Sequence, residues 1–273
     1  MSNKKVILVT GASSGIGYQT AEQLAKEGHI VYGAARRVDA MKPLEAFGVT
    51  PVRLDITDEA SIKEALNLII KKENRIDVLV NNAGYGSYGA VEDVRIEEAK
   101  MQFEVNIFGL ARLTQLVLPY MRKQKSGRII NVGSMGGRLT SYFGAWYHAT
   151  KYALEAFSDG LRMEVADYGI DVSIIEPGGI KTDWGFIAAD KLAESAKGGA
   201  YEAAATKAAE GMRKQYSGNM MSNPKVISNA ISKAVNSRRP KTRYLVGMGA
   251  KLLVFLHAIL PDLWFDALMK RAS

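Results

Sequence analysis

Tyr147 and Lys151 stand four residues apart in a segment whose apolar spacing is typical of a helix, so both side chains fall on one helical face. A free tyrosine has a pKa of about 10, which is high for acid–base catalysis at neutral pH. A neighbouring ammonium group favours the phenolate, so the spacing predicts a lowered pKa for Tyr147 and a role as general acid or base. The pair alone is equally compatible with a surface contact, and the interpretation therefore depends on other residues.

A glycine-containing turn lies between the first strand-like run and the first helical pattern, at residues 10–17. Glycines permit a tight turn and let backbone N–H groups approach a pyrophosphate, and the following helix N-terminus adds a partial positive charge. The alternative is a tight turn that binds nothing. The residues expected around the phosphates are Gly11, Ser13, Ser14, Gly15, Ile16 and Gly17.

Two arginines, Arg36 and Arg37, follow the second strand-like run, which ends at Ala35. In NAD-binding sheets an acidic residue at this place holds the ribose 2′-hydroxyl. Guanidinium groups instead pair with a 2′-phosphate, so the sequence predicts NADP(H) as the cofactor. The alternative is that both arginines are solvated loop residues.

Strand-like apolar runs alternate with helical patterns through the first two-thirds of the chain. The expected strands cover residues 6–10, 30–35, 51–54, 77–80, 127–132 and 170–175, and the expected helices cover residues 16–27, 58–72, 97–122 and 147–166. This alternation predicts an α/β fold, a doubly wound parallel sheet of the Rossmann type with helices on both faces. Such sheets bind ligands at the carboxyl ends of their strands.

The pattern changes after Pro177. Residues 183–222 contain much Ala, Lys and Gly and predict a helical substrate lid. A last strand at 245–247 and a helical tail over 251–272, interrupted at Pro261, are expected within residues 223–273. We expect a single domain over residues 1–273, with its core at residues 4–182.

Composition excludes several classes of protein. The 273 residues are 47% hydrophobic and 23% charged, which is ordinary for a folded chain, and they contain no cysteine, which excludes disulfides and thiolate metal sites. The net charge of +8 is concentrated late in the chain, without a zinc-finger or RNA-binding motif. We interpret it as a solvated face and expect no nucleic acid and no metal.

The apolar stretch at 252–260 is too short for a bilayer, which takes about 20 residues, and no secretory signal is visible, so a soluble cytoplasmic protein is expected.

Further residues extend the pattern in one order along the chain. They are Asn81-Asn82-Ala83-Gly84, Asn106, Ser134, Tyr147-His148-Ala149-Thr150-Lys151 and Pro177-Gly178. With the glycine turn, they give residues 4–182 a resemblance to the short-chain dehydrogenase/reductase family. The resemblance is nearest to the 17β-hydroxysteroid dehydrogenase-like and retinol dehydrogenase-like branch, through residues 33–37, 176–182 and 243–262.

The resemblance implies four catalytic residues. Tyr147 would protonate a carbonyl oxygen, or deprotonate an alcohol, during hydride transfer with a nicotinamide. Lys151 would lower the pKa of Tyr147 and hydrogen-bond the nicotinamide ribose. Ser134 would hydrogen-bond the substrate oxygen, and Asn106 would hold a water that extends a proton relay toward Lys151. The expected activity is an NADP(H)-dependent interconversion of a carbonyl and an alcohol.

The resemblance also implies further cofactor contacts. The adenine side would meet Asp55, Asn82, Ala83 and Gly84, and the nicotinamide carboxamide would meet Pro177, Gly178, Ile180 and Thr182. Many NADP-dependent members carry a basic residue where this chain has Ser14. The prediction of NADP(H) therefore depends on Arg36 and Arg37.

The substrate implied by the resemblance is a lipophilic small molecule, steroid-, retinoid- or acyl-like. Aromatic residues expected near its cleft are Tyr85, Tyr88, Tyr142, Phe143, Trp146, Trp184 and Phe186. Family members usually form homodimers or homotetramers, here through residues 97–122 and 147–166. The basic, apolar tail can rest on a membrane or cover the active site of a partner subunit, and membrane contact is the less expected of the two.

Two other functions remain open at this point. A non-catalytic NADPH-binding sensor or scaffold would carry eroded catalytic residues, and none of the four is eroded. A nucleotide-sugar epimerase of the extended branch would be longer and would space its glycines differently.

Overall fold

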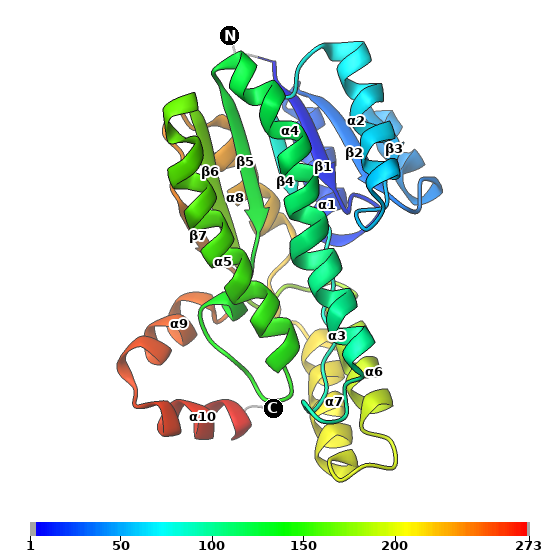
Figure 1. The fold of residues 1–273 in the computed structure, drawn as a ribbon. Helices are drawn as coiled ribbons and strands as arrows, with labels where there is room; N and C mark the ends of the chain where they lie inside the picture. The colour runs from blue at the N-terminus through cyan, green and yellow to red at the C-terminus, as the bar shows by residue number, and fades with distance from the viewer. Residues whose placement is uncertain (1–3, 272–273) are drawn as a thin grey trace.

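The computed structural model describes residues 4–271 and is built around a seven-stranded sheet in the order β3-β2-β1-β4-β5-β6-β7. The strands are β1 Val6–Thr10, β2 Ile30–Ala35, β3 Val49–Arg53, β4 Val78–Asn81, β5 Gly127–Val132, β6 Ile170–Pro177 and β7 Arg243–Val246. All neighbouring strands are parallel (Figure 1). The order of strand addition reverses at β1 and β4, which makes a topological switch point at their carboxyl ends. The predicted doubly wound parallel sheet is confirmed.

Alternate residues of β1 enter two separate cores, one on each face of the sheet. Ile7 and Val9 belong to one hydrophobic cluster, whereas Val6 and Leu8 belong to the other. All five residues of the strand are buried. Burial on both faces explains why the strand is a continuous apolar run in the sequence.

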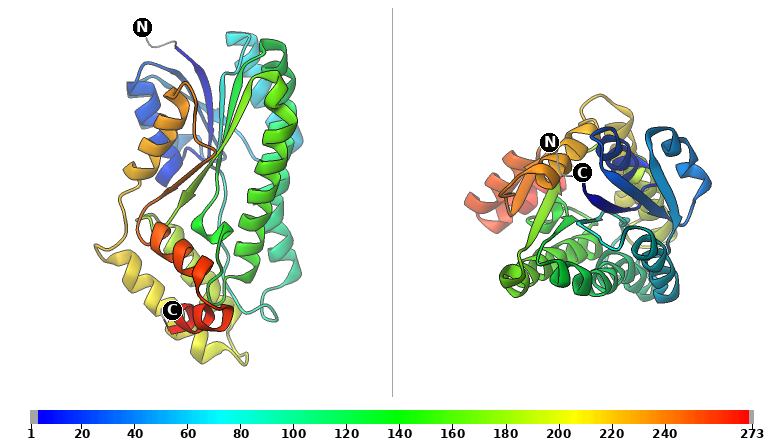
Figure 2. Two further views of the ribbon diagram at one scale, coloured as in Figure 1. Left: turned by 90° about the vertical axis from the view of Figure 1, so that its left-hand side faces the viewer. Right: turned by 90° about the horizontal axis from the view of Figure 1, so that it is seen from above.

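Helices cover both faces (Figure 2). On one face lie α1 Gly15–Lys26 and α8 Lys225–Asn236, which bury Leu24 and Ile231 in one core. On the other lie α2 Glu59–Glu73, α4 Leu110–Gln124 and α5 Ala145–Val165, which bury Ile62, Leu113 and Leu161 in the second. The sheet is therefore closed to solvent on both sides, and its carboxyl edge is left for ligands.

The long helix predicted over residues 97–122 has an internal irregularity. It consists of α3 Ile96–Phe103, a π-helical turn η2 Glu104–Gly109, and then α4. Asn106 lies in the π-turn and is buried. Such turns widen the helix locally and occur often at functional sites.

Short 3₁₀ segments join several of these elements. They are η1 Asp39–Phe47, η3 Met135–Gly137 and η4 Ala166–Tyr168. Residues 39–47 were not assigned to an element from the sequence, because no apolar run of helical length marks them.

The segment predicted to be a substrate lid contains two helices, α6 Trp184–Ser195 and α7 Glu202–Ser217. Small buried side chains, among them Ala189 and Ala209, let these helices pack closely on a third apolar cluster that contains Tyr88 and Tyr147. These helices therefore meet α5 at Tyr147, the side chain proposed for catalysis.

The tail forms α9 Ala250–Ile259 and α10 Asp262–Arg271, with Pro261 between them as predicted. Among residues 4–271, no helix is both long enough and apolar enough to cross a membrane.

Candidate active site

The four residues proposed for catalysis come from three elements at the carboxyl edge of the sheet. Ser134 follows β5, Tyr147 and Lys151 lie on α5, and Asn106 lies in the π-turn. Asn106, Tyr147 and Lys151 are all buried, with 2%, 8% and 8% of their surface exposed. The exposed surface contact that the Tyr–Lys spacing left open is therefore excluded.

The Ser134 hydroxyl interacts with the Tyr147 phenol and acts to lower the pKa of that phenol. The backbone N–H of Gly136 donates to the Ser134 Oγ atom at 3.0 Å, which fixes the orientation of the hydroxyl as the cap of η3. The serine and tyrosine oxygens thus meet at one point at the end of β5.

Lys151 holds its ammonium group between the sheet and the Tyr147 ring. Its Nζ donates to the carbonyl oxygen of Val132 at 3.0 Å and lies 5.9 Å from the centre of the Tyr147 ring. Burial lowers the pKa of Lys151 to about 8, and the charge of Glu155 acts in the opposite direction. This lysine can therefore change its charge within the range of catalytic pH.

The pKa of Tyr147 departs from the expectation drawn from its spacing. Burial and the neighbouring Tyr88 raise it above the usual value, and the hydrogen bond from Ser134 opposes this only in part. The prediction of a lowered pKa for Tyr147, drawn from its spacing with Lys151, is therefore wrong for the protein without a bound cofactor. The physical reason is that the spacing indicates a charged neighbour but not the loss of water around the phenol.

Asn106 is held by the loop that follows β4. Its Oδ1 accepts from the N–H of Tyr85 at 3.1 Å, and its Nδ2 donates to the Tyr85 carbonyl at 2.9 Å and to Thr150 Oγ1 at 3.1 Å. Thr150 precedes Lys151, so the amide is linked to α5 through this neighbour. The water expected at Asn106 remains a prediction.

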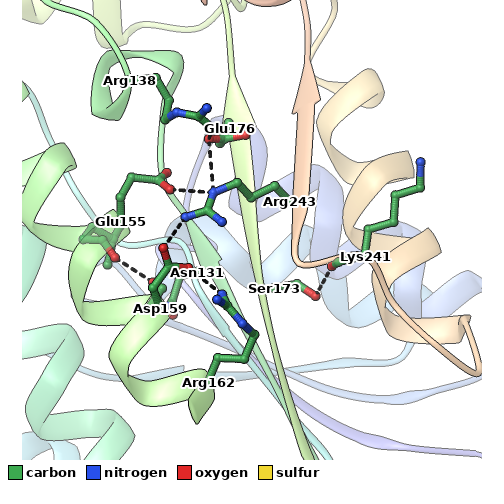
Figure 3. A network of polar contacts seen from close by, with 11 residues as sticks. Asn131, Arg138, Glu155, Asp159, Arg162, Ser173, Glu176, Lys241 and Arg243 are labelled. Carbon is green, nitrogen blue, oxygen red and sulfur yellow. Dashed lines mark hydrogen bonds and ion pairs between the residues drawn. The ribbon is translucent and has the colours of Figure 1, made fainter.

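A network of charged side chains lies one helical turn beyond Lys151 (Figure 3). Glu155 Oε2 accepts from Arg243 Nε at 3.0 Å, and Glu176 Oε1 accepts from Arg138 Nη1 at 3.1 Å. Glu155 Oε1 is buried with no hydrogen-bond partner in the described part of the chain. Burial and the charge of Glu176 raise the pKa of Glu155 to about 7, against the effect of Arg243. Sequence analysis missed this network, because its members are far apart along the chain.

The glycine turn has the shape that a phosphate group needs. Gly11 and Gly15 have φ values of +69° and +56°, and a Cβ added at Gly17 would lie 2.3 Å from the Gly11 carbonyl oxygen. Ser14 caps α1 without a side-chain hydrogen bond, and the first turn of the helix carries no acidic residue. The free N–H groups of this helix start and the absence of a nearby acidic side chain fit the binding of a pyrophosphate.

Asn82 fixes the neighbouring strand to this turn. Its Nδ2 donates to the Thr10 carbonyl at 2.9 Å, while Thr10 Oγ1 accepts from the N–H groups of Asn82 and Ala83, both at 3.0 Å. A Cβ at Gly84 would lie 2.9 Å from Asn106 Oδ1. The Asn82–Gly84 segment is therefore packed between the glycine turn and Asn106.

Both arginines after β2 are exposed and lie beside residues proposed for the cofactor. Arg37 Nη2 donates to Ser13 Oγ at 3.3 Å, next to the glycine turn. Burial tends to raise the pKa of Asp55, but hydrogen bonds from Thr57 and the charge of Arg36 outweigh it and lower that pKa. Asp55 is therefore ionised at neutral pH, with Arg36 close enough to influence it.

The segment after β6 returns to the glycine turn. The N–H of Gly178 donates to the Val246 carbonyl at 2.8 Å, next to Pro177, and Ile180 is buried. A Cβ at Gly15 would lie 3.5 Å from Thr182 Cγ2. The residues predicted to contact the nicotinamide therefore lie next to the glycine turn predicted to contact the phosphates, along the carboxyl edge of the sheet. The turn's remaining member, Ile16, packs against the core with partial exposure.

Aromatic rings surround Tyr147. Its ring centre lies 5.0 Å from that of Trp184 and 5.8 Å from that of Tyr88, and Trp184 in turn lies 6.3 Å from Tyr216. Tyr88 and Trp184 were predicted at the cleft, whereas Tyr216 was missed because it is far along the chain in α7. A Cβ at Gly185 would lie 2.3 Å from the Tyr216 ring, so the glycine after Trp184 is the signal that could have indicated this packing.

The other predicted aromatic residues lie around this group. Phe143 belongs to the same cluster, with Tyr142 packed beside it, and Phe186 contacts the Tyr216 ring. Tyr85 hydrogen-bonds Glu98 at 3.3 Å, and the buried Trp146 Nε1 has no partner in the described residues.

His148 was also missed by sequence analysis. Its Nε2 accepts from the N–H of Ser141 at 3.1 Å, so its Nδ1 carries the proton and donates to the Gly136 carbonyl at 2.9 Å. Burial lowers its pKa. The neutral ring thus ties the loop that carries Ser134 to α5.

Comparison with known proteins agrees with this geometry. Residues 5–190 match the family model described as short chain dehydrogenase. The chain is 38% identical over 265 residues to a probable short-chain type dehydrogenase/reductase of Helicobacter pylori, covering 96% of both proteins. It is 43% identical over 179 residues to the 3-ketodihydrosphingosine reductase of Bacteroides thetaiotaomicron, covering 65% of both.

A steroid-related protein and two solved structures extend the comparison. The chain is 33% identical over 284 residues to rat 17-beta-hydroxysteroid dehydrogenase type 6, covering 97% of this chain and 87% of that protein. A short-chain dehydrogenase from Streptomyces avermitilis superposes with a TM-score of 0.81 at 36% identity, over 94% of this chain and 93% of that one. A serine dehydrogenase complexed with NADP+ superposes with a TM-score of 0.78 at 25% identity, over 89% and 94%. The chain therefore belongs to the short-chain dehydrogenase/reductase family, in a branch like the steroid and retinol dehydrogenases.

Proposed function

We propose that this oxidoreductase interconverts a carbonyl and an alcohol on a lipophilic small molecule, with NADP(H) as cofactor and Tyr147 as general acid or base. The observation that carries the proposal is the convergence of the Ser134 and Tyr147 hydroxyl groups, within a cluster of buried aromatic side chains and beside the ammonium group of Lys151. These are the groups needed to bind one reacting oxygen and to move one proton.

In the proposed reaction the cofactor transfers the hydride and the protein transfers the proton. When bound, the nicotinamide supplies a hydride to the carbonyl carbon in reduction and accepts one from the alcohol carbon in oxidation. In reduction Tyr147 donates its proton to the carbonyl oxygen, and Ser134 hydrogen-bonds the same oxygen as negative charge develops. Lys151 stabilises the phenolate that forms. In oxidation Tyr147 takes the proton back, so protons and electrons balance in both directions.

The choice of NADP(H) rests on Arg36 and Arg37. Both are exposed beside the glycine turn and Asp55, where guanidinium groups can pair with a 2′-phosphate. Among structures of the same fold, the serine dehydrogenase was solved with NADP+ and a protein from Burkholderia phymatum was solved with NAD, so the choice depends on the two arginines. Ser14 stands where many NADP-dependent members have a basic residue, so the glycine turn itself supplies no cationic side chain at that position.

A lipophilic substrate is supported by the pocket and by the relatives. Tyr88, Trp184 and Tyr216 surround Tyr147 with aromatic rings, and aromatic surroundings favour an apolar ligand. Relatives of this chain are named as a ketodihydrosphingosine reductase and a hydroxysteroid dehydrogenase. Both names describe a ketone or an alcohol on a largely apolar skeleton.

We also propose a homodimer through α4 and α5. Phe108, just before α4, and Tyr152 and Met163 on α5 are exposed apolar side chains, at 54%, 40% and 73%. A self-complementary contact would remove them from water.

The test is a panel of ketones, including long-chain acyl and cyclic compounds, in which loss of NADPH absorbance measures turnover. Tyr147→Phe should lower kcat by about 10³-fold. NADPH binding, followed by calorimetry, should be unchanged. Full turnover by the variant would refute the role of Tyr147. Tight NADPH binding without oxidation by any ketone would instead support the sensor or scaffold.

A further inference from the structure

The two tail helices carry a row of exposed apolar side chains. These are Leu252, Phe255, Ile259, Leu263, Trp264 and Leu268, with exposed fractions from 39% to 80%, and we call them the C-terminal patch. On α9 the members are three or four residues apart, so they share one face. Soluble monomers rarely expose contiguous apolar surface of this kind, and such surface usually marks an interaction site.

The patch is not the edge of a core. Ala250 on α9 and Phe265 on α10 are the buried residues of these two helices, as far as the structure describes them. Phe265 packs edge-on against His257, with ring centres 4.8 Å apart, so α10 is held against α9, and α9 in turn contacts β7. Figure 1 and the left view of Figure 2 show α9 and α10 below the sheet, at the end of the molecule that holds α6 and α7.

The patch adjoins the wall of the candidate active site. Lys270 Nζ, near the end of α10, lies 5.4 Å from the centre of the Tyr142 ring. Tyr142 packs on the cluster that contains Phe143 and Tyr147. A surface that covered the patch would therefore lie beside the pocket proposed for the substrate.

The charged residues around the C-terminal patch indicate which kind of surface would bind it. The patch is flanked by Lys251, Lys270 and Arg271, against Asp262 and Asp266. Residues 250–271 thus carry one net positive charge, and the chain as a whole carries +8. A second copy seated on the patch through a two-fold axis would face this positive charge with itself, whereas an anionic surface would complement it.

We propose that the C-terminal patch docks on an anionic phospholipid surface, with its apolar side chains at the acyl boundary and its lysines and arginine among the headgroups. Trp, Phe and Leu on one side and basic residues around them are the features of helices that lie in the plane of a bilayer. Docking revises the lower expectation given to membrane contact from the sequence, because the structure shows how exposed these side chains are. Docking goes beyond the proposed activity and does not depend on it.

The test uses the full-length protein and two kinds of vesicle. We expect sedimentation with vesicles that contain phosphatidylglycerol, weaker sedimentation with pure phosphatidylcholine, and release as salt is raised. Trp264 is the exposed tryptophan of the chain's three, so its emission should shift to shorter wavelength on binding. Trp264→Phe should bind but lose most of this shift.

Paired variants separate docking from folding. Leu263→Ser with Trp264→Ser should lower vesicle binding at least about tenfold. Leu68→Ser, at an exposed leucine on α2, should not change it. Circular dichroism and thermal unfolding establish that each variant folds.

Three outcomes would overturn the proposal. They are no binding to anionic vesicles, equal binding to both kinds of vesicle, and a dimer in sedimentation velocity that the double variant dissociates. The last would assign the patch to a second copy of the chain.

Discussion

The ammonium group of Lys151 lies 5.9 Å from the centre of the Tyr147 ring, one helical turn along α5. Since burial raises the pKa of Tyr147, the phenolate needs a positive neighbour at the moment the proton leaves. Lys151→Met should lower kcat/KM by about 10²–10³-fold. Lys151→Arg, which keeps the charge, should retain more activity, and steady-state kinetics of the two variants would show this. Equal loss in both would indicate that packing, not charge, is the contribution of Lys151.

The lowered pKa of Lys151 predicts an alkaline limit to the reaction. As pH rises through about 8, Lys151 loses its proton and the positive charge beside Tyr147 disappears. The wild-type rate should therefore fall with a transition near this pH, as measured by kcat/KM against pH. A rate that stays constant well above that pH would contradict the assignment of the charge to Lys151.

Glu155 should set the position of that limit. Its carboxylate favours the charged form of Lys151, so Glu155→Gln should move the alkaline transition to lower pH. Asp159→Asn is the matched control, because Asp159 also pairs with Arg243, at 2.6 Å, and is more exposed. The control should leave the transition in place. A shift in both variants would show that Arg243, and not the carboxylate of Glu155, is responsible.

The same carboxyl predicts how stability depends on pH. The pKa of Glu155 is raised to about 7 in the folded chain, so the folded state binds more protons than the unfolded state between about pH 4.5 and 7. The contribution of Glu155 is thus fully present below that window and is lost as pH rises through it. Across the window, wild type should lose stability relative to Glu155→Gln by up to about 1.4 kcal/mol per pH unit. Urea unfolding at several pH values measures the difference, and a difference of the opposite sign would contradict a raised pKa for Glu155 in the folded chain.

Arg36→Ala with Arg37→Ala should weaken NADP+ binding by about 10–100-fold and leave NAD+ binding nearly unchanged. The physical reason is that only NADP+ carries the phosphate that the guanidinium groups would pair with. Calorimetry with both dinucleotides tests the prediction. A wild-type chain that prefers NAD+ would refute the argument from these arginines.

Gly17→Ala should abolish measurable dinucleotide binding and reduce stability by about 1–3 kcal/mol. The new Cβ would lie 2.3 Å from the Gly11 carbonyl oxygen and 2.5 Å from Asn82 Nδ2, so the glycine turn must shift. Gly160→Ala is the control, because a Cβ there has no neighbour within 4 Å. Chemical unfolding and dinucleotide titration should show a loss of stability and affinity in Gly17→Ala but not in Gly160→Ala. Similar results for the two variants would show that the turn can accommodate a methyl group at position 17.

The strands could be predicted from the sequence because a strand buried on both faces is a continuous apolar run, as in β1. The π-turn could not, because residues 96–124 keep a helical spacing of apolar residues throughout, and a single extra residue in a turn changes no residue type. The pairing of Tyr147 with Lys151 was predictable from spacing, whereas the pKa of Tyr147 was not, because it depends on burial by Tyr88 and the lid.

The charged network around Glu155 could not be predicted from the sequence either. Glu155 and Arg243 meet across 88 positions of sequence, through the parallel pairing of β6 with β7. Each residue alone resembles any other charged residue on a helix or a strand. Only the order of the strands brings them together, and strand order is set by the whole fold.

The π-turn at Glu104–Gly109 holds one residue more than an ordinary helical turn. Deleting one residue there would restore the regular α-helix and leave α4 in its register, so Leu113 and Val117 would stay in the interior. The damage would instead fall on Asn106, whose amide lies in the turn and hydrogen-bonds Tyr85 and Thr150. Shortening this segment by a single residue should therefore cost activity more than stability.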